Sequence, residues 1–179
     1  SDRAVALDPD NASILAMRSV ILTTLRDFDN ALALAERATR LAHSDANAMA
    51  LAAITLYACS RPQEAMKQVE LAKRHCPRYP PWYHVMLARC LWMLERPDDA
   101  IAAALAACKA DPLYGQPHIE MALIYGEADR LPEAQKAVEA ALSIDPEFSA
   151  SAYLRGLPLR DPSHEDRRRT AFKAAGAPD

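Results

Sequence analysis

The sequence predicts an all-α protein built as a stack of antiparallel helix pairs, on three observations. First, one stretch recurs along the chain, in Arg61–Tyr79, Arg96–Tyr114 and Arg130–Phe148, with a further copy beginning at Asp27. Second, small residues and prolines recur at fixed places in the copies. Third, 51% of the 179 residues are apolar, alanine dominates, and there are only four glycines. This composition favours closely packed helices over strands.

Two alanine positions mark every copy. The early alanine recurs at separations of 34, 35 and 34 residues, and a second alanine follows it seven residues later. The early alanines are Ala31, Ala65, Ala100 and Ala134, and the later ones are Ala38, Ala72, Ala107 and Ala141. Three copies also close on a proline, at Pro77, Pro112 and Pro146. A shared period at independent positions indicates an internal structural repeat.

Each repeat is expected to contain two helices of about 14 residues joined by a short turn. The first helices are predicted at Ala12–Leu25, Asp45–Cys59, Pro81–Leu94 and Gly115–Ala128. The second helices are predicted at Asp29–Ala42, Pro62–His75, Pro97–Ala110 and Pro132–Ile144. Small residues in the first helices lie opposite the early alanines, which lets the two backbones approach closely. These small residues are Ser19, Ala53, Ala88 and Ala122.

The two ends of the chain depart from the repeat. Residues 1–9 are interpreted as the end of a truncated preceding repeat, so the chain is expected to be a fragment of a longer protein. Residues 10–148 hold the four repeats, at about 12–45, 46–79, 81–114 and 115–148. Residues 149–179 predict a C-terminal capping segment, whose last helix runs from about Ser163 to Ala175. Solenoids need such atypical ends with a polar outer face.

The period, the paired alanines and the closing prolines resemble the tetratricopeptide repeat (TPR) family along almost the whole chain. Arg18 and His43 depart from the family pattern in the first repeat. The resemblance implies a solenoid of antiparallel helix pairs that forms a right-handed superhelix, with a capping helix at its C-terminus. It also implies that the chain binds other proteins.

In that family the first helices line a concave groove, and the corresponding positions here are mostly apolar and centred on two tryptophans. The candidate groove residues are Val20, Ile54, Tyr57, Trp82, Val85, Arg89, Trp92, Ile119 and Leu123. The lysine and asparagine of chaperone-binding members are missing, which argues against that partner. An amphipathic helix or an apolar extended peptide fits better. The alternative is that the tryptophans only pack against neighbouring helices.

A narrower resemblance lies in the C-terminal residues. Leu157-Pro158, Arg160-Asp161-Pro162, Phe172 and Ala175–Pro178 are similar to the end of the TPR region of bacterial adenylate and guanylate cyclases. This implies that a nucleotide cyclase domain precedes the array in the parent protein. Related arrays also follow other bacterial signalling and transcriptional proteins.

Catalytic signatures are absent from the sequence. It contains no phosphate-binding glycine loop, no H-E-x-x-H and no G-x-S-x-G. The four cysteines include no C-x-x-C pair, which favours buried thiols in a reducing cytoplasm over a metal site. The net charge of −3 gives no reason to expect nucleic acid or an anionic membrane as partner. We therefore expect no cofactor and no enzymatic activity from this chain.

The expected function is a non-catalytic protein-interaction module, forming the regulatory or scaffolding region of a larger cytoplasmic signalling protein in bacteria. Its partner would be a protein or peptide, or another domain of the same protein. Two alternatives stay open: self-association as a homodimer, and an interaction domain of a transcriptional regulator.

Overall fold

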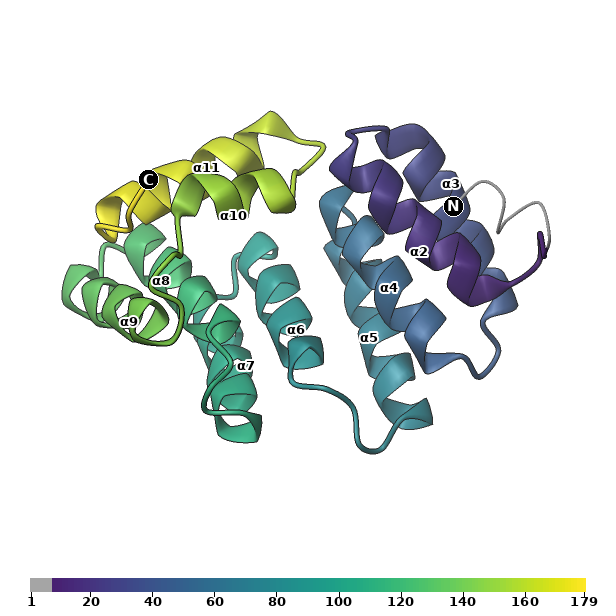
Figure 1. Ribbon diagram of the computed structural model, residues 1–179, viewed down its shortest axis with the longest axis horizontal. Helices are drawn as coiled ribbons and strands as arrows, with labels where there is room; N and C mark the ends of the chain where they lie inside the picture. The colour runs from purple at the N-terminus through teal and green to yellow at the C-terminus, as the bar shows by residue number, and fades with distance from the viewer. Residues whose placement is uncertain (1–7) are drawn as a thin grey trace. The chain divides into compact units, whose positions relative to one another are not determined.

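The computed structural model describes residues 8–179, which fold into ten helices with no strand (Figure 1). The first helices of the four pairs are α2 (Ala12–Thr24), α4 (Ala46–Ala58), α6 (Trp82–Met93) and α8 (Gln116–Glu127). The second helices are α3 (Phe28–Leu41), α5 (Pro62–His75), α7 (Pro97–Ala110) and α9 (Leu131–Ile144). They are followed by α10 (Ala150–Gly156) and α11 (Pro162–Ala174). The all-α prediction is confirmed, and each predicted helix begins and ends within one residue of the observed bounds. The expected truncated helix before Asp8 lies outside the described residues.

Six of the repeat helices begin in one of two ways. Asn11, Asp27 and Asp45 precede α2, α3 and α4, and their side chains accept hydrogen bonds from backbone N–H groups of the first turn. The second helices α5, α7 and α9 have no such side-chain cap and instead carry a proline in their first turn. There the preceding arginine pairs with an acidic residue three positions later. These pairs are Arg61–Glu64, Arg96–Asp99 and Arg130–Glu133.

The turn inside each repeat contains one non-glycine residue in the left-handed backbone conformation. These residues recur with the spacing of the repeat, and their φ angles lie between 55° and 62°. They are Arg26, Ser60, Glu95 and Asp129. A left-handed conformation costs an L-residue roughly 1–2 kcal/mol. Every repeat therefore carries the same local conformational cost where the chain reverses between its two helices.

The chain divides into two compact units, and the boundary falls between Tyr79 and Pro80. Unit 1 contains α2 to α5 together with the short segment Pro158–Arg160, and unit 2 contains α6 to α11. The boundary lies in the turn Tyr79-Pro80-Pro81, where the repeat is one residue longer than elsewhere.

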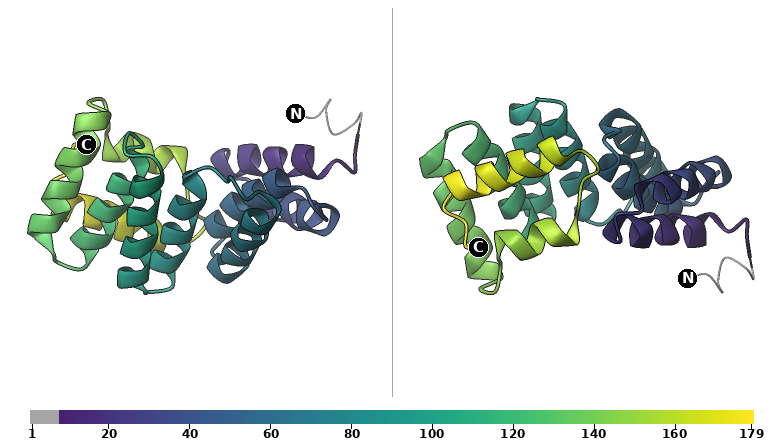
Figure 2. Two further views of the ribbon diagram at one scale, coloured as in Figure 1. Left: turned by 90° about the horizontal axis from the view of Figure 1, so that it is seen from below. Right: turned by 90° about the horizontal axis from the view of Figure 1, so that it is seen from above.

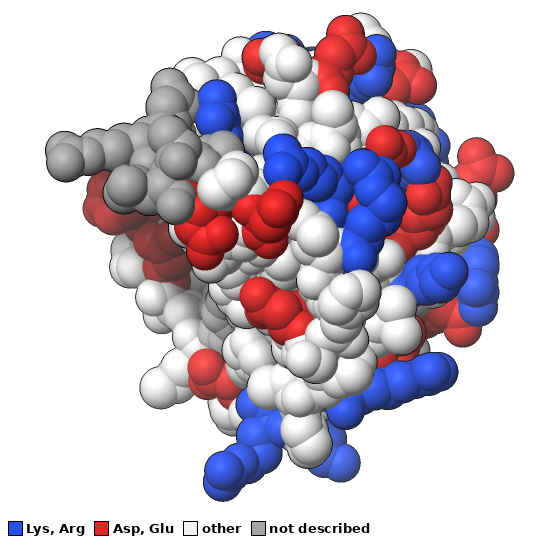
Figure 3. Space-filling view, turned by 90° about the vertical axis from the view of Figure 1, so that its right-hand side faces the viewer, with Lys and Arg blue, Asp and Glu red and all other residues white. Residues whose placement is uncertain are grey.

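In unit 1, α2 and α3 both pack against α4. The Oγ atom of Ser19 lies 2.8 Å from Oγ1 of Thr55, so buried hydroxyl groups satisfy each other where α2 crosses α4. The segment Pro158–Arg160 joins this unit through the backbone N–H of Arg160, which donates to the Ala58 carbonyl at 2.8 Å. On the face shown in Figure 3, lysine and arginine side chains lie among aspartates and glutamates. The surface potential of that face is therefore of mixed sign.

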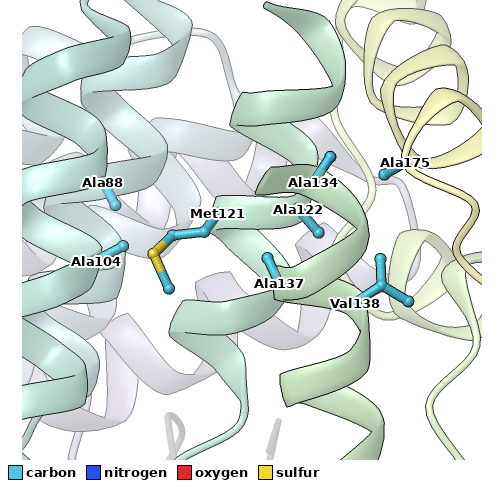
Figure 4. Close-up of a cluster of buried hydrophobic side chains, with 8 residues drawn as sticks. All are labelled: Ala88, Ala104, Met121, Ala122, Ala134, Ala137, Val138 and Ala175. Atoms are coloured by element: carbon cyan, nitrogen blue, oxygen red, sulfur yellow. The ribbon is translucent and has the colours of Figure 1, made fainter. Parts of the chain in front are cut away.

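In unit 2, the buried small residues allow the helices to approach closely. Figure 4 shows Met121 of α8 reaching toward Ala88 and Ala104, with Ala122, Ala134, Ala137 and Val138 beside it. Ala175, directly after α11, belongs to the same cluster. All eight repeat-marking alanines of the two units are at most 1% exposed, which confirms that they form the packing seam.

Candidate protein-interaction site

The C-terminal helices of unit 2 lie on the face formed by its first helices. Helix α11 packs along α8, and α10 packs against α11 (Figures 1 and 2). We call this surface the inner face of unit 2 and define it by Arg89 and Trp92 of α6 and Gly126 and Glu127 of α8. By the family resemblance, the first three occupy groove positions and Glu127 directly follows one. The candidate site is therefore a surface of unit 2 on which α11 lies.

Gly126 sets the distance between α8 and α11. A Cβ atom built on Gly126 would lie 2.3 Å from the backbone oxygen of Ala171 and 3.3 Å from Cβ of Ala175. The first of these distances is shorter than real Cβ contacts, and the atom that it meets is backbone. The two helices can cross this closely only because neither carries a larger side chain at the crossing point.

Trp92 and Glu127 together hold an arginine of α11. The Nε of Arg167 donates to Oε1 of Glu127 at 2.7 Å, and its guanidinium lies 4.9 Å from the centroid of the Trp92 ring. The indole N–H of Trp92 donates to the other carboxylate oxygen of Glu127. Glu127 thus orients the indole and pairs with the cation that stacks on it.

A buried ion pair joins the inner face to α10. The Nε of Arg89 lies 2.7 Å from Oε1 of Glu120, and both side chains are at most 10% exposed. The hydroxyl of Tyr153 accepts from Arg89 Nη2 at 2.9 Å and donates to Glu120. Burial raises the pKa of the Tyr153 phenol, so the hydroxyl remains protonated and able to donate. The network satisfies both buried charges.

A second buried arginine lacks such compensation. Arg168 is 1% exposed, and its Nη1 donates to the Leu157 carbonyl at 2.8 Å while the guanidinium lies over the Tyr153 ring. Among the residues that the structure describes, its Nη2 atom has no hydrogen-bond partner. Next to it, the Phe172 ring packs edge-on against Phe148 and Tyr153, with centroids 6.2 and 5.7 Å apart. Apolar packing by Phe172, rather than the Arg168 charge, therefore anchors α11.

The structure places the predicted groove residues differently in the two units. In unit 2, Val85, Arg89, Trp92, Ile119 and Leu123 are all buried. Trp82 is half-buried, and its ring lies edge-on to Tyr83 at 4.5 Å. In unit 1, Tyr57 is buried, whereas Val20 and Ile54 are half-buried. Only Arg89 and Trp92 have side-chain contacts to α10 or α11 among the interactions described above.

Sequence reasoning missed the partners of these two residues. Glu120, Glu127, Tyr153 and Arg167 complete the charged and aromatic contacts, yet they lie outside the repeat-defined groove positions. Gly126 could have indicated this site from the sequence, because glycine is rare in this chain and lowers helix stability by about 1 kcal/mol relative to alanine. Such a glycine indicates a close backbone approach.

Two pockets that are open to solvent flank Arg167. One has a volume of about 240 Å³ and is lined by Trp92, Glu95, Pro97, Ile124, Glu127 and Arg167. The other has a volume of about 440 Å³ and is lined by Gly126, Glu127, Ser163, Asp166, Arg167 and Ala171. The Arg167 side chain therefore has solvent-accessible space on two sides.

Residues 8–179 were compared with the requirements of a metal site, an activated thiol and a membrane-spanning helix. No group of three or more histidine, cysteine, aspartate and glutamate side chains among residues 8–179 could hold a metal ion. Cys108 Sγ lies 3.7 Å from His118 Nε2, but burial raises the pKa of the thiol and lowers the pKa of the imidazole. Both shifts favour the neutral forms, which is the opposite of an activated thiolate. Within the same residues, no helix is long and apolar enough to cross a membrane.

Comparisons with known proteins identify the fold. No protein-family model and no curated protein matches the sequence. Among solved structures, PilW, a widely conserved type IV pilus biogenesis factor, matches with a TM-score of 0.73 and 20% identity over 98% of this chain and 78% of PilW. TTC0263, a thermophilic TPR protein of Thermus thermophilus, matches with a TM-score of 0.68 and 19% identity over 92% of this chain and 89% of that one.

A third structure, YrrB, is a TPR protein with an unusual peptide-binding site. It matches with a TM-score of 0.58 and 20% identity over 97% of this chain and 87% of YrrB. At such identities the likeness concerns the fold alone. The predicted fold class is confirmed: the chain has the fold of a TPR solenoid.

Proposed function

We propose that this chain is a non-catalytic interaction module that binds an amphipathic helix on the inner face of unit 2. One observation carries the proposal. The inner face already holds a helix with one buried side, α11, which belongs to the same chain. Its residues Arg168, Ala171 and Phe172 are buried in unit 2, while most of its other residues are exposed. A surface that accommodates one such helix has the shape and chemistry to accommodate another.

The proposal can be tested by displacing α11 while leaving the residues of the inner face unchanged. Ala171→Glu should push α11 off the inner face, because Ala171 is 1% exposed at a close crossing of α8 and α11 that has no room for a larger charged side chain. Ala174→Glu makes the same chemical change on the exposed side of the same helix and serves as the control. Each variant must first show the helical circular dichroism of the native chain.

The readout is the set of proteins retained from native cell extract, identified by mass spectrometry. We expect the Ala171→Glu chain to retain a partner more strongly than the native chain or the Ala174→Glu chain. Adding Trp92→Glu to Ala171→Glu should abolish that retention, since Trp92 belongs to the inner face. Equal retention by all four forms would place the interaction elsewhere on the molecule.

The parent protein is a second, finer proposal: a bacterial signalling protein such as a nucleotide cyclase. It is supported by the C-terminal resemblance, whose residues serve to dock α11. Asp161 caps α11 by accepting from the Ser163 N–H at 2.9 Å, Phe172 and Ala175 are buried, and Gly176 has a φ of 72° that suits a helix end. Cyclase catalytic aspartates in the parent sequence would support this proposal, and a helix-turn-helix would favour the transcriptional alternative.

Self-association is the other candidate function, and an exposed apolar stripe on α2 favours it. Met17, Ile21 and Leu25 are spaced by four residues and are 48%, 39% and 70% exposed. The equivalents of Ile21 in α4 and α8, Thr55 and Ile124, are buried. Light scattering on the native chain and on Leu25→Glu tests this candidate. A native chain that stays monomeric at high concentration would contradict it.

A further inference from the structure

We propose that the inner face of unit 2 selects a helix with an arginine, a small residue and an aromatic residue in the order of Arg167, Ala171 and Phe172, and that α11 is an exchangeable internal copy of that ligand. This inference rests on the proposed function and names the class of partner. The ligand helix would carry arginine at one position, alanine or glycine four residues later, and an aromatic residue directly after it.

Arginine is the first requirement because of the geometry around Arg167. Its guanidinium stacks 4.9 Å from the Trp92 centroid while its Nε donates to Glu127 at 2.7 Å. A planar guanidinium can stack on a ring and donate to a carboxylate in the same pose, whereas the compact ammonium of lysine cannot do both as well. The pair Trp92–Glu127 therefore distinguishes arginine from lysine.

A small residue is the second requirement because of Gly126. The backbone of Ala171 lies so close that even a methyl group on α8 would overlap it, at 2.3 Å. Ala171 itself is 1% exposed, so a ligand helix that crosses α8 equally closely must present alanine or glycine at this position. The Cβ atom of Ala175, one turn later, would lie 3.3 Å from the same added methyl group, so the requirement extends to the next turn.

An aromatic residue is the third requirement because of the pocket that receives Phe172. Its ring is 1% exposed and packs edge-on against Phe148 and Tyr153. Buried aromatic side chains are among the largest contributors to binding energy at protein interfaces. A ligand helix without a ring at this position would leave the pocket unfilled.

Exchange is inferred from how poorly Arg168 is accommodated. Docking α11 buries this guanidinium to 1% exposure and leaves Nη2 without a hydrogen bond among the described residues. Burying a charge that keeps one hydrogen bond, to Leu157, and one ring contact, to Tyr153, but no carboxylate partner opposes docking. A partner helix that keeps Arg167, Ala171 and Phe172 but replaces Arg168 by an apolar residue would bind the same face more tightly.

The test uses a fluorescently labelled synthetic peptide of residues 161–179 and the full chain carrying Ala171→Glu. Binding is followed by fluorescence anisotropy. We expect saturable binding of the native peptide, at least tenfold weaker binding of the Arg167→Glu peptide, and a several-fold loss with Arg167→Lys. The Arg169→Glu peptide makes the same charge change at an exposed position and should bind within about twofold of the native peptide.

The native chain tests whether its own α11 competes with the peptide for the inner face. Its own α11 is tethered at a high effective concentration, so the peptide should bind it at least tenfold more weakly than it binds the Ala171→Glu chain. Equal binding to both chains, or equal binding of the Arg167→Glu and Arg169→Glu peptides, would overturn the inference. If the Ala171→Glu chain retains a partner from extract but not this peptide, the proposed function stands and the inference fails.

A measurement on the native chain keeps the inference testable if Ala171→Glu does not fold. Trp92 is 3% exposed and its indole N–H is bonded to Glu127 beside Arg167, so opening of this cluster should speed the exchange of this N–H with solvent. An exchangeable α11 predicts that this N–H exchanges at least tenfold faster than the slowest backbone amides of α8. Exchange of both at the rate of global unfolding would show that α11 is a fixed part of the fold.

Discussion

The backbone oxygen of Ala171 occupies the space into which any side chain at Gly126 would extend, since a Cβ there would lie 2.3 Å from it. This relationship joins the last helix of the chain to α8. A glycine inside a helix weakens that helix by about 1 kcal/mol relative to alanine. Here the glycine allows α11 to lie directly on the inner face of unit 2, and the packing gained there offsets that loss.

We therefore expect Gly126→Ala to destabilise the chain, although alanine is the better helix former. The added methyl group must displace the α11 backbone, which should cost about 1–3 kcal/mol of unfolding free energy. Gly156→Ala is the control, because Gly156 lies in α10 and has no atom within 4 Å of an added Cβ. It should be neutral or stabilise by up to about 1 kcal/mol. Urea unfolding of both variants checks this, and similar stabilities would contradict the close approach.

Substitution by methionine should change the free energy of unfolding differently at the two buried arginines of unit 2. Arg89→Met leaves Glu120 buried without its cation and with only the Tyr153 hydroxyl as donor, so we expect a loss of about 3–5 kcal/mol. Arg168→Met removes a buried charge whose Nη2 is unpaired among the described residues, at the expense of one hydrogen bond to Leu157. The free energy of unfolding should then change by less than about 1 kcal/mol or increase. Chemical denaturation at one pH compares the pair, and equal losses would contradict the assigned difference.

The sequence was sufficient to predict the repeat and its packing seam. Alanines at positions such as Ala100 and Ala107 recur with the period, and close helix packing requires small residues there. The caps and first-turn prolines then located the helix ends to within one residue. These features are local or periodic, which is why a single sequence reveals them.

The sequence was not sufficient to predict what covers the inner face. Helix α11 lies outside the repeat, so the period says nothing about where it docks. The contact between Arg167 and Glu127 joins residues 40 positions apart, and no local pattern encodes that pairing. The left-handed turn residues were missed for another reason. Glycine is the residue type that normally marks such a turn, and Glu95 gives no such signal.

Packing at the seam gives a third prediction. Ala100 is fully buried between helices, so Ala100→Leu should overpack the seam and cost about 1–3 kcal/mol. Ala102 lies on the exposed side of the same helix, and Ala102→Leu is the matched control. We expect its unfolding free energy to stay within about 0.5 kcal/mol of the native value. Thermal unfolding of the two variants measures the difference, and an unchanged midpoint for Ala100→Leu would count against the observed register.

The turn at Glu95 gives a fourth prediction. Its φ of 57° is unfavourable for an L-residue and free for glycine. Glycine loses more conformational entropy on folding than other residues, and this loss offsets part of the gain. Glu95→Gly should therefore stabilise the chain by about 0.5–1 kcal/mol. Glu95→Ala removes the same side chain without relieving the backbone, so it should give no such gain. Urea unfolding separates the two variants, and an equal effect of both would assign the change to the side chain.

The buried thiol of Cys90 makes stability depend on pH in the alkaline range. Burial raises its pKa from 9.0 to about 12 in the folded chain. Between these values the unfolded state has released the proton and the folded state has not, so the free energy of unfolding falls as the pH rises. Each unit of pKa difference corresponds to about 1.4 kcal/mol. Below pH 9 both states keep the proton, and the thiol contributes no pH dependence.

A comparison of the native chain with Cys90→Ala isolates this contribution, because all other titrating groups are common to both. Cys90→Ala should cost stability at pH 7 through the lost packing of a fully buried side chain. At a pH of about 10.5 that cost should be smaller by about 2 kcal/mol, since the native thiol has by then lost part of its advantage. Urea unfolding at the two pH values gives both numbers. An equal cost at both would show that the thiolate forms as readily in the folded chain as in the unfolded chain.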